Sequence, residues 1–246
     1  MSDKALSRIR GLAQRFYGAV VGLVYPDLCL SCDARVPESG DAYGLPFCPA
    51  CLRKLPRATQ EIIRKRLARL RQSNGVFENV FALWVFDEGG GIQRLQHRIK
   101  YENQPALGRR VGRHLGRVIS SSSSRTGYDL LLPIPLSRTR ELERGYNQSD
   151  VIASGIAEVL QGSLDVDPSL LIRQRATRSQ TDLSRIERWK NVSGAFALSR
   201  NQDLRGKRIL LVDDILTTGA TVTAAALPLR ERQALVDLAV FGVTTV

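Results

Sequence analysis

The sequence lacks the features of a membrane-spanning or exported protein. No run among its 246 residues approaches the ~20 apolar side chains that a spanning helix needs. Basic residues precede a short apolar stretch at 16–24, but no small-x-small cleavage site follows. We therefore expect a cytoplasmic protein whose residues 1–28 form a packing helix. A helix lying on a membrane surface is the weaker alternative.

Histidine, aromatic and acidic residues are also scarce. The two histidines, His97 and His114, lie on predicted basic helices without a nearby carboxylate in sequence, so we expect packing or surface roles. Aromatic residues form 6% of the chain, which limits the stacking of nucleic-acid bases. The chain has 36 lysines and arginines but only 24 acidic residues, which gives a formal net charge of +12. This excess indicates anionic partners, either a phosphorylated substrate or nucleic acid.

Cysteine occurs only as two close pairs. Each pair has the spacing C-x2-C, and fifteen residues separate the pairs. Such pairs suit tetrahedral Zn²⁺, because each supplies two thiolates from one small turn. Two disulfides or a redox-active CxxC are the alternatives, and a reducing cytosol disfavours structural disulfides. We predict a structural zinc site with the ligands Cys29, Cys32, Cys48 and Cys51.

The rest of the chain is organised around residues 208–223, which read RILLVDDILTTGATVT. The run at 209–213, apolar until its final acid, predicts a buried parallel strand with Asp213 and Asp214 at its carboxyl end. Small hydroxyl-bearing residues follow and open an Ala-rich helix. A loop between a strand and a helix N-terminus can bind phosphate through its N–H groups, and Gly219 lets the backbone approach closely.

Two adjacent acids beside that loop would repel a ligand that was only phosphate. They fit a phosphorylated sugar, whose hydroxyls donate hydrogen bonds to carboxylates, or a Mg²⁺ ion one sugar's length from the phosphate. The plainer alternative is a capped helix after a core strand, with both acids solvated. The complete string favours the ligand site.

The string resembles the PRPP-binding motif of the type I phosphoribosyltransferases. In that family the paired acids bind the ribose hydroxyls and the loop binds the 5′-phosphate. The resemblance implies that Asp213 and Asp214 bind ribose. It assigns the phosphate to Thr217, Thr218, Gly219, Ala220 and Thr221.

The whole chain resembles the ComF/GntX family, in which a zinc ribbon precedes a type I phosphoribosyltransferase domain. The four cysteines, RGYNQ at 144–148, residues 180–191 and the string at 208–223 carry the resemblance. Residues 95–102 match a further segment that includes Lys100. Members are associated with natural competence, the uptake of single-stranded DNA, and some with gluconate use.

We therefore predict an α/β fold, a type I phosphoribosyltransferase-like parallel sheet with flanking helices after a small four-cysteine zinc ribbon. Strands are expected at 80–86, 128–133 and 235–243, with a short strand at 170–173, and two helices are expected on either side of 103–105. The predicted domains are an N-terminal helix (1–28), the ribbon (29–56), a basic linker (57–76) and the phosphoribosyltransferase-like domain (77–246).

The favoured function is Mg²⁺-dependent phosphoribosyl transfer from PRPP. Asp213 and Asp214 would offset positive charge on the ribose, while basic residues from Arg138 or the 173–190 loop would neutralise the departing pyrophosphate together with Mg²⁺. Residues 173–190 would close over the site. Further loop or pyrophosphate contacts are expected from Lys100, Arg144, Asn147, Gln148 and Arg185. The alternative is a non-catalytic module that binds single-stranded DNA with the competence machinery and keeps a regulatory phosphate or PRPP pocket.

Overall fold

The computed structural model describes residues 27–36, 44–69, 71–122, 127–160, 164–174 and 194–245. The chain divides into two compact units between Lys54 and Leu55. Most of the helix predicted over 1–28 lies outside the described residues. Within the described ranges, no helix is both long enough and apolar enough to cross a membrane.

The first unit is built around the cysteine pairs. Cys29 and Cys32 lie in a turn closed by an antiparallel bridge between Leu28 and Arg35. The second pair lies at the start of helix α2 (Pro49–Lys54). This arrangement agrees with the predicted ribbon.

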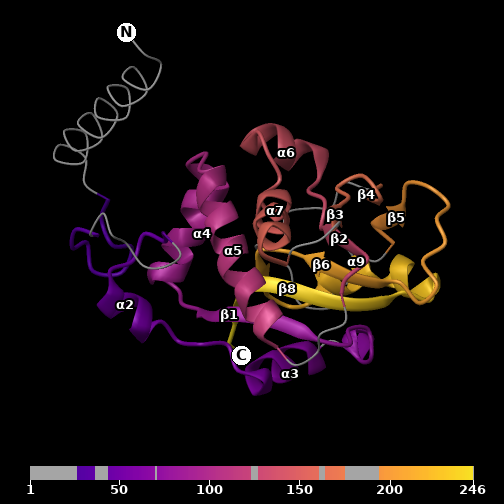
Figure 1. The fold of residues 1–246 in the computed structure, drawn as a ribbon, viewed down its shortest axis with the longest axis horizontal. Helices are drawn as coiled ribbons and strands as arrows, with labels where there is room; N and C mark the ends of the chain where they lie inside the picture. Colours follow the sequence, from indigo (N-terminus) through magenta and orange to yellow (C-terminus); the bar gives the residue numbers. More distant parts are fainter. Residues whose placement is uncertain are drawn as a thin grey trace, which may run out of the picture. The chain divides into compact units, whose positions relative to one another are not determined.

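The second unit contains a six-stranded sheet in which every pairing is parallel (Figure 1). Along the sheet the strands are β1 (Val80–Phe86), β8 (Leu235–Thr244), β6 (Arg208–Val212), β2 (Leu130–Pro133) and β3 (Asp165–Val166), and short β7 (Ile215–Leu216) also pairs with β8. Pro133 lies beside Val212, so β2 and β6 end together at the carboxyl edge of the sheet. Residues after both strands therefore meet at that edge.

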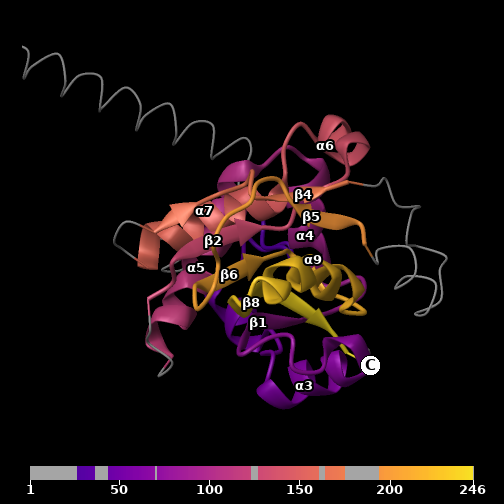
Figure 2. The same cartoon turned by 90° about the vertical axis from the view of Figure 1, so that its right-hand side faces the viewer.

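Helices cover both faces of this sheet, which explains why the strands are apolar almost throughout (Figures 1 and 2). On one face lie α4 (Gly91–Tyr101), α5 (Pro105–Ser121) and α7 (Gln148–Leu160). On the other lie α3 (Gln60–Ala68) and α9 (Ala220–Glu231), over the largest cluster of buried side chains. The predicted α/β fold is confirmed.

Shorter elements complete the second unit. They are the 3-10 helix η1 (Arg71–Ser73), helix α6 (Arg138–Arg144) and an antiparallel pair of strands, β4 (Leu171–Arg173) and β5 (Phe196–Leu198). The predicted strand at 80–86 and the helix break at 103–105 are confirmed, and Asn103 makes that break with φ +48°.

The predicted linker at 57–76 lies within the second unit. The Ala58 N–H donates to the Leu83 carbonyl, and the Thr59 hydroxyl caps α3 by accepting from the Ile62 N–H. Ile63 of α3 is buried in the main core. The segment is therefore part of the α/β fold, since α3 covers an otherwise exposed stretch of β8 and β1.

Candidate functional site

The candidate site is a cleft of about 160 Å³ at the carboxyl edge of the sheet. It is lined by residues 134–136, which follow β2, by the acid pair that follows β6, and by the loop into α9. In open parallel sheets, crevices outside the carboxyl ends of the strands are the usual ligand sites. The string at 208–223 thus lines a cleft, as its pattern predicted.

Asp213 lies half-buried at the end of β6. Its Oδ1 accepts from the Ser149 hydroxyl at 3.1 Å and from the Asp214 N–H at 2.8 Å. Burial, and then the negative charge of Asp214, raise the pKa of Asp213 to about 7. At neutral pH this carboxyl therefore exchanges readily between its charged and protonated forms.

Asp214 is more deeply buried, with 6% of its surface exposed. Its Oδ2 contacts the Lys100 ammonium at 2.5 Å and accepts from the Gln96 amide at 2.9 Å. Burial alone would raise the pKa of Asp214, but Lys100, Gln96 and the Ile215 N–H lower it below its usual value. Asp214 is therefore the ionised member of the pair. The sequence identified Lys100 as a ligand contact, whereas in this structure it is the partner of Asp214.

The loop into α9 turns at Gly219, which takes φ +84°, a conformation that residues with a Cβ rarely adopt. Thr217, Gly219 and Thr221 line the cleft. Thr218 accepts a hydrogen bond from the Ala220 N–H at 3.4 Å, and Ala220 is buried. The first N–H groups of a helix have no acceptor within the helix, so this turn can receive an anion.

Four basic side chains line the same cleft: Lys100, Arg140, Arg144 and Arg173. Arg140 and Arg144 are four residues apart and therefore share one face of α6, whereas Arg138 lies two residues from Arg140 and is exposed. The cleft is thus lined by Arg140 rather than by Arg138, the residue that the sequence favoured. Burial, and then the charge of Arg140, lower the pKa of Arg173.

The RGYNQ motif positions the wall of the cleft. Gln148 lines the cleft and accepts from the Arg144 guanidinium at 2.8 Å. Asn147 is buried and donates to the Ile134 carbonyl at 3.1 Å, which ties the end of β2 to the start of α7. The Tyr146 hydroxyl donates to the Ile99 carbonyl of α4. Arg185 and most of the segment at 173–190 lie outside the described residues.

Neither histidine lines the cleft. His114 is 3% exposed and stacks on Trp84, with ring centroids 5.3 Å apart. His97 is exposed, and its Nδ1 lies 3.3 Å from Glu102, a carboxylate partner that the sequence analysis did not expect.

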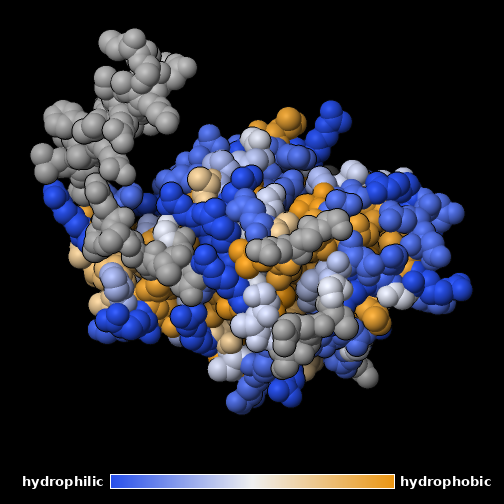
Figure 3. Space-filling view, viewed as in Figure 1, coloured by the Kyte–Doolittle hydropathy of each residue, from blue (hydrophilic) through white to orange (hydrophobic). Residues whose placement is uncertain are grey.

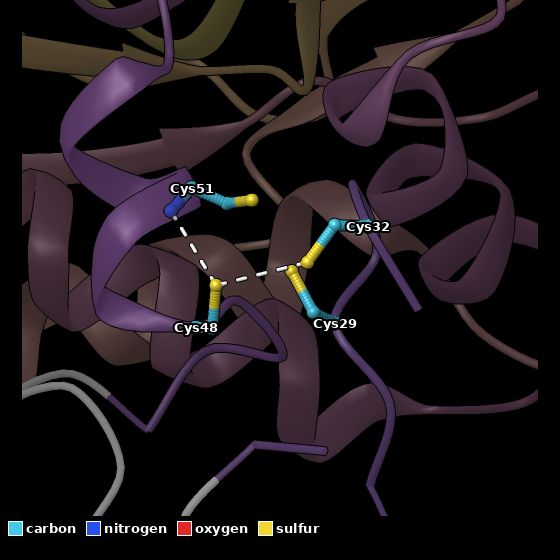
Figure 4. Close-up of side chains that lie close together, drawn as sticks. All are labelled: Cys29, Cys32, Cys48 and Cys51. Carbon is cyan, nitrogen blue, oxygen red and sulfur yellow. Dashed lines mark hydrogen bonds between the residues drawn. The ribbon is translucent and has the colours of Figure 1, made fainter. Parts of the chain in front are cut away.

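The four cysteine Sγ atoms all lie within 4.8 Å of one another and belong to two short segments of the first unit (Figure 4). Zn–S bonds of about 2.3 Å in a tetrahedron place sulfurs about 3.8 Å apart. Cys32 and Cys48 have that separation, 3.8 Å. Burial alone would raise the pKa of Cys29, but backbone N–H donors bring it to about 6. All four cysteines are free, and the cluster can hold a metal ion.

Comparison with known proteins supports this architecture. The family model described as "Phosphoribosyl transferase domain" matches residues 150–241. The DNA utilization protein YhgH of Escherichia coli O157:H7 is 30% identical over 145 residues, 58% of this chain and 62% of its own length. Its counterpart in Salmonella typhimurium is 28% identical over 219 residues, 83% of this chain and 91% of that protein. Competence protein F of Haemophilus influenzae is 30% identical over 143 residues, 56% of this chain and 61% of its own length.

By these matches the chain is similar to the ComF family, as the motifs in its sequence predicted. It spans less than two thirds of the Escherichia coli relative. Among solved structures, TT1426 from Thermus thermophilus is 20% identical, covering 54% of this chain and 72% of its own, with a TM-score of 0.32.

The sequence did not single out Gln96, Ser149 or Arg140, and it included Arg173 only as the first residue of the segment at 173–190. Gln96 and Ser149 hold the acid pair, and the two arginines line the cleft. One signal for Gln96 was available in the sequence. Gln96 and Lys100 are four residues apart on a predicted helix, so they share one face of it, and both lie in the segment at 95–102 that resembles the ComF family.

Proposed function

We propose that this protein binds PRPP in the cleft at the carboxyl edge of the sheet and transfers its phosphoribosyl group. The observation that carries the proposal is the arrangement of charge. The acid pair, the loop into α9 and arginines from α6 and β4 all line the same space. This combination suits a ligand that carries both hydroxyls and anionic groups.

The acid-pair side of the cleft supplies recognition of the ribose. Asp213 would accept hydrogen bonds from ribose hydroxyls, and residues 217–221 would bind the 5′-phosphate. Arg140, Arg144 and Arg173 would offset the charge of the pyrophosphate as it leaves C1′. Fixed charges that face developing charge lower the barrier of such a reaction without a covalent intermediate.

The sequence also predicts Mg²⁺, and one oxygen of the acid pair, Oδ2 of Asp214, is not available to that ion. Mg²⁺ takes oxygen ligands at about 2.0–2.1 Å in near-octahedral geometry. Oδ2 of Asp214 already has two donors, Lys100 and Gln96. We assign no step to a metal ion at this pair.

The metal suited to the cysteine cluster is Zn²⁺. Cys29, Cys32, Cys48 and Cys51 would hold it as thiolates, and the ion would stabilise the fold of the first unit.

Calorimetric titration with PRPP tests the proposal. Asp213→Asn and Gly219→Val should each weaken binding about ten- to a hundredfold, because a charged hydrogen bond is worth roughly 1.5–3 kcal/mol and a branched Cβ crowds the loop. Asp129→Asn is the matched control, since Asp129 pairs with Lys207 beyond the amino end of β6. If both cleft variants bind PRPP as the wild type does, the cleft is not its site.

A second candidate function is the binding of single-stranded DNA, supported by the net charge of +12 and by the names of two relatives, a DNA utilization protein and a competence protein. On the face seen in Figure 3, hydrophilic areas lie on either side of hydrophobic patches. On α5, Arg109, Arg110 and Arg117 are exposed, although Arg109 pairs with Glu158.

Binding carried by several arginines should give a linear fall of log K with log salt, at a slope near −0.7 for each contact. Fluorescence anisotropy with a labelled oligonucleotide measures it. A flat response to salt, or no binding at low salt, would remove DNA as a partner.

A further inference from the structure

The ion pair between Lys100 and Asp214 joins α4 to the end of β6 inside the cleft. The side chains are 18% and 8% exposed, so water has limited access to both charges. A carboxylate oxygen has two lone pairs. Lys100 and Gln96 both contact the same oxygen, Oδ2 of Asp214. That oxygen therefore has no lone pair left for a cation.

Lys100 is held in place by the fold around it. Gln96 and Lys100 are four residues apart and lie on one face of α4, while Ile92, Leu95 and Ile99 of the same helix are buried. The Tyr146 hydroxyl holds the carbonyl of Ile99, the residue before Lys100. On the other side, the Asp214 carbonyl accepts from the N–H groups of Phe241 and Gly242 in β8. The backbone that carries each partner is therefore held by packed elements.

We propose that Lys100 takes the place of a divalent cation beside Asp214, so that the cleft binds a ribose 5-phosphate unit without a metal ion on its acid pair. The proposal rests on the proposed function, since it concerns how the same cleft recognises its ligand. Lysine is a compact point charge with three donors and can neutralise a carboxylate much as a cation does.

This arrangement gives the two acids different roles. Asp214 is a positioning residue, ionised and held by α4. Oδ2 of Asp213 has no hydrogen-bond partner among the described residues, so it is the oxygen available to a sugar hydroxyl. Because Lys100 neutralises Asp214, one negative charge fewer in the cleft repels an anionic ligand.

The first experiment uses ribose 5-phosphate, which lacks the diphosphate through which PRPP itself carries Mg²⁺. Calorimetric titrations use zinc-loaded protein in buffer freed of divalent cations by a chelating resin, with and without added Mg²⁺. The wild-type affinity should agree within about twofold between the two buffers, whereas Lys100→Met should bind about tenfold more weakly without Mg²⁺ and recover when it is added.

Lys207→Met is the matched control, because it removes the same charge from an ion pair with Asp129 beyond the other end of β6. It should behave as the wild type does. Lys100→Gln gives the same loss of charge if the methionine variant does not fold. A wild type that needs Mg²⁺ for ribose 5-phosphate, or Lys100 variants that are indifferent to it, would overturn the proposal.

The second experiment needs no sugar and separates this proposal from the proposed function. Mn²⁺ is titrated alone and followed by electron paramagnetic resonance. Lys100→Met should gain one Mn²⁺ site that the wild type and Lys207→Met lack, and Lys100→Met with Asp214→Asn should lose it. Mn²⁺ binding by the wild type that Asp214→Asn abolishes would refute the role of Lys100. Failure of the wild type to bind ribose 5-phosphate or PRPP in any buffer would instead refute the proposed function.

Discussion

Burial and charged partners together decide the pKa values of individual residues in this protein. Asp213 and Asp214 are neighbours in sequence, yet their pKa values move in opposite directions because only one of them contacts Lys100. His97 and His114 differ in their burial. The first lies in solvent beside Glu102, and the second is enclosed against Trp84.

We predict that His114 makes the protein sensitive to mild acid. Burial, and then the charges of Arg57 and Arg117, lower its pKa from 6.5 to about 4. Between these values the unfolded state binds more protons than the folded state, so the free energy of unfolding falls as the pH drops. One pKa unit corresponds to about 1.4 kcal/mol, which gives a loss of up to about 3 kcal/mol between pH 7 and pH 4.

Urea unfolding of the wild type and of His114→Phe across this pH range measures the effect. The phenylalanine ring keeps the stack on Trp84 but cannot take up a proton, so this part of the pH dependence should disappear. His97→Phe is the control and should retain it, since His97 is exposed. Parallel pH profiles for the wild type and His114→Phe would show that His114 has no such role.

Among the site residues, the sequence predicted those that lie within one contiguous string. It missed those that come from distant parts of the chain and contact that string only in the fold. Asp213, Asp214 and Gly219 share a stretch whose spacing reflects one strand, one turn and one helix. Gln96 reaches Asp214 across 118 positions of sequence, and that contact depends on how α4 packs on the sheet. The sequence favoured Arg138 over Arg140 because it did not show where α6 begins. The first residue of that helix decides which side chains face the cleft.

Among the elements, α5 and α7 make the closest helix pair. Gly108, Gly112 and Gly116 recur every fourth residue on α5, so their bare backbone forms one stripe. A Cβ on Gly112 would lie 2.1 Å from the Ile152 carbonyl oxygen, and a Cβ on Gly155 would lie 2.1 Å from the Arg109 carbonyl oxygen. The two backbones therefore touch where these glycines meet.

We predict that Gly112→Ala destabilises the protein by about 2 kcal/mol, even though alanine favours a helix, because a backbone atom must move to admit the methyl group. Thermal unfolding measures this change. Gly127→Ala is the control, since a Cβ there would have nothing within 4 Å. Equal melting temperatures for the two variants would mean that the helices separate at little cost.

The sequence predicted elements that bury apolar side chains on a regular period. The runs of β1 and β8 are apolar because helices cover both faces of the sheet, and such runs are visible in sequence. It predicted a short strand at 170–173, where β4 lies, but not its partner β5. A three-residue strand that pairs across a long connection has too few side chains to set a period.

For the molecule as a whole, the ribbon and the α/β unit should respond differently to loss of metal. We predict one Zn²⁺ per chain, bound by the four cysteines. Cys48→Ser should lose that metal and unfold the first unit, while the second unit keeps its own buried core. Elemental analysis gives the stoichiometry, and limited proteolysis shows which unit opens.

Ser31→Ala is the control, because Ser31 lies between two of the cysteines and only its backbone N–H donates to Cys29. It should keep the metal. Freshly purified wild-type protein that contains disulfides and no zinc would contradict the assignment.

The order of strands has a consequence for how the protein is made. β8 lies between β1 and β6, yet it is the last strand along the chain. During synthesis β1, with its Phe81, Leu83 and Trp84, has no neighbour in the sheet until β8 has left the ribosome. At about 5–20 residues per second, some 150 residues of chain follow β1 before its partner is complete, which is a delay of roughly 8–30 seconds. Over that interval an apolar strand is open to pairing with other nascent chains, so production of the folded protein should depend on chaperones that shield β1 until β8 arrives.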